Sequence, residues 1–104
     1  MSSKARALVL NDRDNVAVAL DDIEANTSVR VRKGCQVIEV PVRQEIPFAH
    51  KLAIRDIRKG HPIYKYGEIM GKTTKPVRTG QHVHIHNAES IRGKTVRRKA
   101  LRRP

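Results

Sequence analysis

Short apolar runs alternate with turn residues along the whole chain, and Gly, Pro, Asn and Asp punctuate it every eight to twelve residues. This spacing is typical of an all-β domain. Residues 16–20 form a continuous apolar run, which indicates a strand buried on both faces. Residues 28–32 alternate apolar with basic side chains, and with residues 36–42 they predict a hairpin around Lys33-Gly34.

Further strands are expected at residues 5–10, 61–67 and 68–72, with a polar turn at residues 11–15. No segment shows sustained helical periodicity, and residues 21–26 have room for one helical turn at most. Pro47 fixes its own φ and favours an extended residue before it, so it predicts a rigid lead-in to His50.

The densest chemistry lies in residues 82–87, where three histidines alternate with Val83 and Ile85. In an extended strand the imidazoles would share one face, and Val83 and Ile85 would face the core. Neighbouring imidazoles would lie about 6.5–7 Å apart and could chelate one ion. His82 and His86 would be about 13 Å apart, too far to share an ion unless the strand broke.

Spacing alone leaves several roles open for His82, His84 and His86. Neutral imidazole binds zinc, iron, nickel and copper, and it also titrates near neutral pH. The row therefore predicts metal binding, acid–base chemistry or anion binding, with a solvated polar strand face as the alternative.

Composition narrows the class of protein. The 104 residues fit one domain with an aliphatic core, since aromatics make up only 3% and Trp is absent. A single cysteine, Cys35, excludes an internal disulfide and fits a reducing compartment. No apolar run approaches the length of a membrane span and no secretory h-region opens the chain, so we expect a cytoplasmic protein.

The net charge of +12 is uneven. Residues 92–104 carry seven Lys and Arg and no acid, so they contribute +7 and leave only +5 for the rest. We therefore expect a domain at residues 1–90 and a basic, disordered tail at residues 91–104 that solubilises the protein or docks on an acidic partner.

One set of motifs, in this order and spacing, resembles the N-terminal domain of the altronate and galactarate dehydratase family over about residues 8–88. The matching positions are Ile46-Pro47, His50-Lys51, Ala53, Asp56-Ile57, Gly60, Ile63, Lys65-Tyr66-Gly67, Ile69, Gly71, Gly80 and His82-Val83-His84-Ile85-His86-Asn87, together with residues 11–18. The resemblance implies a compact β-clip fold of the SAF type. Phe48-Ala49 departs from it, because related chains more often carry a small residue and glycine before His-Lys.

The resemblance also implies a function. Related enzymes remove water from sugar acids to give 2-keto-3-deoxy acids, and a similar two-subunit lyase removes sulfite from sulfolactate. They use a divalent metal, usually iron or manganese. We therefore expect a small lyase subunit that is inactive without a separate large subunit, acts on an anionic hydroxy acid and is open to homo-oligomer formation.

The resemblance and the chemistry of the side chains together give the expected roles. Removing a proton beside a carboxylate creates an enediolate, whose charge a metal or fixed cations must stabilise. His82, His84 and Tyr66 are the expected catalytic residues, and His84 and His86 the expected metal ligands. The expected substrate contacts are His50, Lys51, Lys65, Gly67 and Asn87.

Two other functions compete with the lyase subunit. The basic tail suits nucleic acid, but Phe48, Tyr64 and Tyr66 are too few for a base-stacking platform, so we rank this interpretation lower. The other alternative is a non-catalytic module of the same fold that binds a sugar acid or a partner.

Overall fold

The computed structural model describes residues 5–90, and these residues contain strands and turns but no helix. This confirms the all-β prediction. The helical turn considered for residues 21–26 does not form; instead Ile23 makes an isolated bridge with Ile46. The tail expected at residues 91–104 lies outside the described residues.

Nine strands form two sheets within residues 5–90. The larger sheet has the order β4-β3-β1-β2-β5-β8, in which β1 and β3 run parallel and the other neighbours antiparallel. The smaller sheet has the order β6-β7-β9. The bounds are β1 Arg6–Val9, β2 Val16–Ala19, β3 Thr27–Lys33, β4 Gln36–Val42, β5 Lys51–Ala53, β6 Pro62–Lys65, β7 Glu68–Thr73, β8 His82–Val83 and β9 Ala88–Ser90.

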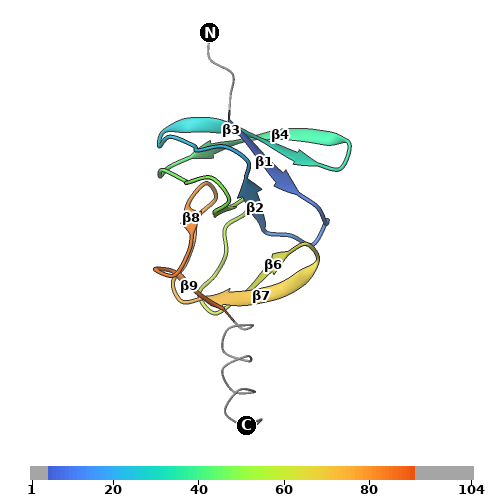
Figure 1. Cartoon of the computed structure of the whole chain (residues 1–104). Helices are drawn as coiled ribbons and strands as arrows, with labels where there is room; N and C mark the ends of the chain where they lie inside the picture. Colours follow the sequence, from blue (N-terminus) through green and yellow to red (C-terminus); the bar gives the residue numbers. More distant parts are fainter. Residues whose placement is uncertain (1–4, 91–104) are drawn as a thin grey trace, which may run out of the picture.

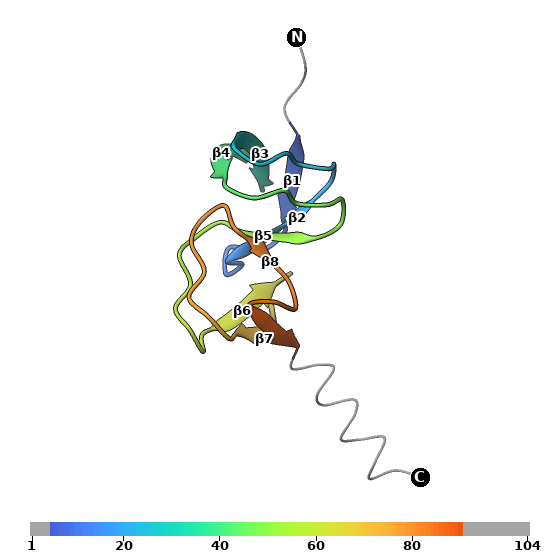
Figure 2. The same ribbon diagram turned by 90° about the vertical axis from the view of Figure 1, so that its left-hand side faces the viewer.

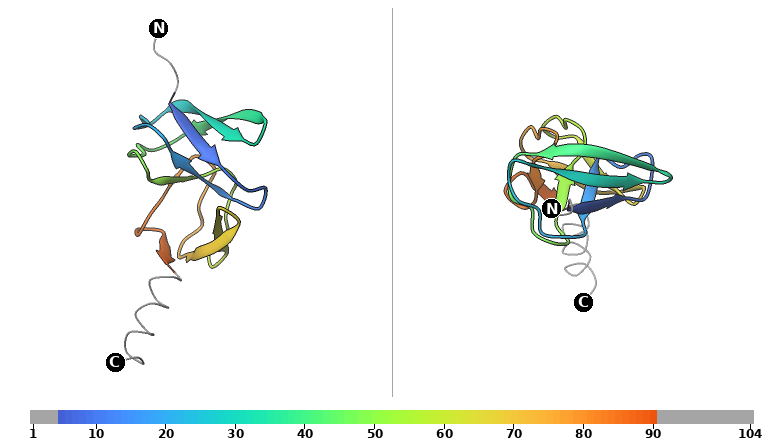
Figure 3. Two further views of the ribbon diagram at one scale, coloured as in Figure 1. Left: turned by 45° about the vertical axis from the view of Figure 1, so that its right-hand side comes forward. Right: turned by 90° about the horizontal axis from the view of Figure 1, so that it is seen from above.

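Two hairpins mark opposite ends of the molecule, β3–β4 at one and β6–β7 at the other (Figures 1 and 3). The predicted β3–β4 hairpin is confirmed, with Lys33 paired to Gln36 across a two-residue loop. In β6–β7 the loop is Tyr66-Gly67, and both residues have positive φ, 57° and 80°. Two successive positive φ values are those of a type I′ turn, whose twist matches that of the strands it joins.

The core consists of two clusters that share the central strands. β2 gives Ala17 and Ala19 to one cluster and Val16 to the other, which confirms that this strand is buried on both faces, although Val18 is only half-buried. The larger cluster also holds buried residues of β1, β3, β4 and β5 with Ile23 and Ile46. The smaller one contains Val16, Ala53, Ile57, Ile63, Val77 and Val83.

Four turns share one pattern, in which a buried Ile or Val is followed three residues later by a residue of positive φ. The buried residues are Ile23, Ile46, Ile57 and Val77, and the positive-φ residues are Asn26, Ala49, Gly60 and Gly80. The buried residues bridge in pairs, Ile23 with Ile46 and Ile57 with Val77. The turn that ends at Ala49 leads directly into His50 and β5, and the turn that ends at Gly80 leads towards β8, which begins at His82.

Candidate functional site

The pairing of β5 with β8 brings distant histidines together. These strands lie side by side (Figure 2), with Lys51 opposite Val83 and Leu52 opposite His82. Continuing the antiparallel register by one residue puts His50 opposite His84. Because His82 and His84 are two residues apart, their rings project to the same side. The register therefore assembles three imidazoles, which we call the histidine cluster (His50, His82 and His84).

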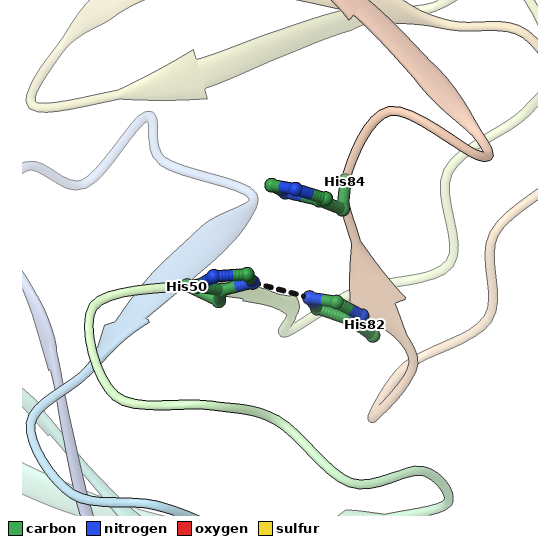
Figure 4. A group of neighbouring side chains, drawn as sticks. All are labelled: His50, His82 and His84. Atoms are coloured by element: carbon green, nitrogen blue, oxygen red, sulfur yellow. Dashed lines mark hydrogen bonds between the residues drawn. The ribbon is translucent and has the colours of Figure 1, made fainter.

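The three rings of the histidine cluster are stacked (Figure 4). The ring centroids are 4.5 Å apart for His50 and His84, 5.0 Å for His50 and His82, and 5.3 Å for His82 and His84. A hydrogen bond of 2.8 Å joins Nδ1 of His50 to Nε2 of His82, and the tautomers decide which nitrogen donates. His86 lies beside the cluster, with its ring centroid 5.4 Å from that of His82.

The prediction of one extended strand through His86 was wrong, because β8 ends at Val83 and the chain then turns. Asn87 holds this turn. Its side-chain amide donates to the carbonyl of His82 at 2.8 Å and accepts from the backbone N–H of His84 at 2.9 Å. The turn brings His86 back towards His82 and leaves Ile85 84% exposed instead of in the core. Val83 is buried as expected.

The surroundings of His82 and His84 favour the neutral form of these two imidazoles. Partial burial, followed by the neighbouring His50, His84, His86 and Lys51, lowers the pKa of His82 to about 4. Burial, then His50, Lys51 and His86, also lowers the pKa of His84. Neutral rings keep the lone pairs that a metal ion or a proton requires.

The residues present fit a divalent metal. His50, His82 and His84 each offer one ring nitrogen, and these three atoms lie within 4.8 Å of one another. Three neutral imidazoles with a further position open are a ligand set that catalytic zinc and other borderline ions accept. Of the expected metal ligands His84 and His86, only His84 belongs to this group, and His50, an expected substrate contact, joins it.

A surface depression of about 190 Å³ adjoins the cluster. His84 and Lys51 contribute to its wall, which is otherwise mostly apolar. Lys51 is half-buried, and burial followed by the charge of Lys65 lowers its pKa. The remaining lining residues are Ile63, Met70, Gly71, Ile85, Ala88, Glu89 and Ser90.

Tyr66 and Gly67 sit in the turn of the β6–β7 hairpin rather than against the imidazoles. The backbone N–H groups of Tyr66 and Gly67 donate to the two carboxylate oxygens of Asp14 at 2.9 and 2.8 Å. Tyr66 is 45% exposed, and the ammonium of Lys65 lies 5.0 Å from its ring centroid. A Cβ on Gly67 would come to 2.7 Å from the amide nitrogen of Asn11, an exposed side chain that can move aside, so it is the positive φ that favours glycine here.

Sequence reasoning missed Asp14 as a positioning residue, because a polar turn accounts for residues 11–15 when the sequence is considered alone. Asp14 is only 1% exposed, and neighbouring Asn15 also holds the hairpin: its side chain donates to the carbonyl of Pro62 and accepts from the N–H of Tyr64. The sequence did contain a signal for this role, since Asp14 and Asn15 directly precede a wholly apolar strand. A polar side chain in that place is drawn into the interior and must find hydrogen-bond partners there.

The fold and the site together define a small β domain that presents clustered imidazoles beside a depression whose wall contains a lysine. The chain belongs to the altronate/galactarate dehydratase SAF domain family, whose model matches residues 5–91. This confirms the family that the sequence motifs indicated. Its finer assignment to the β-clip fold stays an expectation.

Relatives of two kinds are similar to this chain. The alpha subunit of (2R)-sulfolactate sulfo-lyase from Chromohalobacter salexigens is 32% identical over 88 residues, which cover 81% of this chain and 94% of the relative. Altronate dehydratase of Escherichia coli K12 is 40% identical over 77 residues, or 74% of this chain. Galactarate dehydratase (L-threo-forming) of the same strain is 31% identical over 74 residues. The matched parts span only 15% and 13% of those two dehydratases.

These relatives are lyases, and one of them is by name a subunit of a larger enzyme. Within residues 5–90, no helix is long and apolar enough to cross a membrane.

Proposed function

We propose that this chain is the small subunit of a metal-dependent lyase that acts, with a separate large subunit, on an anionic hydroxy acid. The observation that carries the proposal is the histidine cluster in a domain of this family. The match to 94% of a sulfo-lyase alpha subunit supports a separate small subunit. Dehydration of a sugar acid of the altronate or galactarate type is the first reaction to test, and elimination of sulfite from sulfolactate the second.

Both reactions follow one scheme. A base takes the proton from C2, beside the carboxylate, and the bond from C3 to its leaving group breaks. A hydroxyl leaves as water after accepting a proton, whereas sulfite leaves with the electron pair of the carbon–sulfur bond. The enol that remains takes up a proton at C3, loses the proton of its C2 hydroxyl and becomes the 2-keto acid. The site must therefore stabilise negative charge at the carboxylate and move protons at two carbons.

His50, His82 and His84 would hold the metal, since their ring nitrogens converge. A bound divalent ion supplies a Lewis acid that offsets the charge developing on the carboxylate. The hydrogen bond between His50 and His82 orients two of the rings, and the Asn87 side chain fixes the backbone of His82 and His84. Asn87, expected as a substrate contact, is thus better supported as a positioning residue.

A ring nitrogen that holds an ion has no lone pair left for a proton. We therefore assign the proton transfers to groups outside the cluster, namely His86 and residues of the large subunit. Tyr66, the third expected catalytic residue, lies in the β6–β7 turn, where its ring is beside the ammonium of Lys65. His86 lies beside the cluster, at 5.4 Å between ring centroids from His82. Lys51, on the wall of the depression, is placed to hold substrate oxygens.

The first experiment is to express the tagged chain in its native host and to identify the co-purifying protein and bound metal. A stoichiometric partner of several hundred residues, with iron or manganese and activity on altronate, galactarate or sulfolactate, is the expected result. Recovery of nucleic acid that dissociates steeply with salt would favour the basic binding module instead. Turnover by the isolated chain would contradict the subunit assignment.

Metal binding is tested separately with single substitutions. His82→Ala removes a central member of the cluster and should weaken binding of Mn²⁺ or Zn²⁺ at least about tenfold. His61→Ala is the matched control, because His61 is exposed and forms its hydrogen bonds to Arg58 and Thr73 through backbone atoms. Equal loss of affinity in both variants, or in neither, would argue against a metal site at the cluster.

A further inference from the structure

The depression beside the cluster has a cationic side that the proposed metal chemistry does not use. Lys51 enters it from β5, and this lysine is half-buried beside apolar neighbours such as Ile63 and Met70. An ammonium that has lost part of its water interacts more strongly with an anion than one on an open surface does.

Lys65 lies just beyond the residues that line the depression, on the same face of β6 as Ile63, with its ammonium 5.0 Å from the Tyr66 ring centroid. Ile63 contributes to the depression, and residues two apart on a strand share a face, so Lys65 follows Ile63 on that face about 6.6 Å further along β6. β6 is regular here, because the register shift of this hairpin lies in β7: Ile63 pairs with Gly71 and Tyr64 with Ile69, which leaves Met70 as the extra residue. Met70, the extra residue of the bulge, contributes to the wall of the depression.

Besides burial, the charge of Lys65 is the one cause within residues 5–90 that lowers the pKa of Lys51, so the two lysines face the same region with like charge. Glu89, which also lines the depression, forms an ion pair with Lys72 at 3.7 Å. Like charges at a desolvated site are costly until an anion lies between them.

We propose that Lys51 and Lys65 form a second anion subsite beside the histidine cluster, so that the substrate is a dianionic hydroxy acid. This inference rests on the proposed function for the place of the first carboxylate, which lies at the metal. The second anionic group, a carboxylate or a sulfonate, then binds the lysines at the far end of the depression. A monocarboxylate would place a neutral hydroxymethyl group there and leave the repulsion between the lysines unrelieved.

The test compares galactarate with galactonate, which differ only in whether C6 is a carboxylate or a hydroxymethyl group. Each is titrated into the chain at constant ionic strength without added metal, and the side-chain NMR signals of the lysines are followed. Galactarate should bind at least about tenfold more tightly than galactonate and shift the signals of Lys51 and Lys65. Sulfolactate, as a second dianion, distinguishes a sulfonate from a carboxylate preference.

Three variants sharpen the result. Lys51→Met keeps the apolar stem and should bring the two affinities to within about twofold. Lys51→Arg restores the charge and should recover most of the preference. Lys59→Met removes an exposed lysine of the turn at residues 57–60, and it should leave the preference for galactarate over galactonate unchanged.

Equal affinity for the two acids, absence of binding by either, or an undiminished preference in Lys51→Met would overturn the subsite. Because binding is measured without turnover, a failure of the lyase proposal leaves this test intact. Conversely, an active complex that prefers galactonate over galactarate would keep the lyase and overturn the dianion preference.

Discussion

At the scale of single residues, Ala49 carries backbone strain directly beside the site. It has φ 73°, a region that costs an L-residue with a Cβ roughly 1–2 kcal/mol. The equivalent positions of the other three turns carry Asn26, Gly60 and Gly80, which tolerate this conformation. The chain therefore holds strain in the residue that immediately precedes His50.

Ala49→Gly should consequently stabilise the protein, by up to about 1 kcal/mol once the greater freedom of glycine in the unfolded chain is subtracted. Gly60→Ala is the mirror control. Gly60 has φ 80°, and no atom lies within 4 Å of the place that a Cβ would occupy, so this change adds only the strain and should cost about 1 kcal/mol. Urea unfolding measures the free energy of unfolding of both variants. A destabilised Ala49→Gly variant would refute the backbone strain assigned to Ala49.

The pH dependence of stability follows from His82. Its pKa in the folded protein, about 4, lies below the ordinary 6.5, so below pH 6.5 the unfolded chain binds a proton more readily than the folded one. In metal-free protein, stability should be complete above about pH 6.5 and decline as the pH falls towards 4. His82→Gln should flatten this decline in pH-dependent thermal unfolding, and a profile unchanged by the substitution would disprove the assignment.

The sequence was sufficient to single out the histidines, but not their arrangement. Alternation of His with Val and Ile predicted a strand, because period 2 is a local signal. The turn at His84 depends on Asn87, whose side chain satisfies the backbone of His82 and His84 in place of strand pairing. His50 joins the histidine cluster only because β5 pairs with β8. This pairing brings together His50 and His82, which are 32 residues apart in the sequence, and no local pattern predicts it.

At the scale of elements, the β6–β7 hairpin depends on a buried carboxylate from another part of the chain. Asp14 accepts from both backbone N–H groups of the type I′ turn, and this fixes the hairpin that carries Lys65. The β3–β4 hairpin was predictable because its alternating side chains and its Gly turn are local signals. The turn at Tyr66-Gly67 was missed, since residues 61–67 were expected to form one strand. The docking of the β6–β7 hairpin on residues 14 and 15 was not predictable either, since it is made by side-chain contacts about 50 residues apart.

Asp14→Ala should therefore destabilise the protein by about 3 kcal/mol, because two N–H groups lose a charged acceptor in a buried place. Asp12→Ala, at an exposed residue two positions earlier, should change stability by less than about 0.5 kcal/mol. Thermal or denaturant unfolding distinguishes them. Similar values for the two variants would mean that the carboxylate does not hold the turn.

At the scale of the whole molecule, the two core clusters are joined by shared strands. β2 and β5 each contribute to both, through Ala17 and Leu52 to the larger and through Val16 and Ala53 to the smaller. Neither cluster can lose its packing without disturbing a strand of the other. The two sheets should therefore unfold together rather than one after the other.

Two matched core substitutions test this. Val31→Ala in the larger cluster and Val83→Ala in the smaller one should each cost about 2 kcal/mol and shift a single transition. The transition is followed by NMR signals from β3 and from β7. Separate midpoints for these two strands would show that the sheets are independent units.

The short strand β8, only two residues long, bears on when the histidine cluster forms during folding. It pairs at the edge of the sheet and closes a long stretch of chain between His50 and His82, so its formation must wait until most of the domain is in place. An ion bound by His50 together with His82 and His84 would link the two ends of that stretch, and it would restrict the unfolded chain much as a covalent cross-link does. Loading with metal would then be the final step of folding as well as the first step of activity.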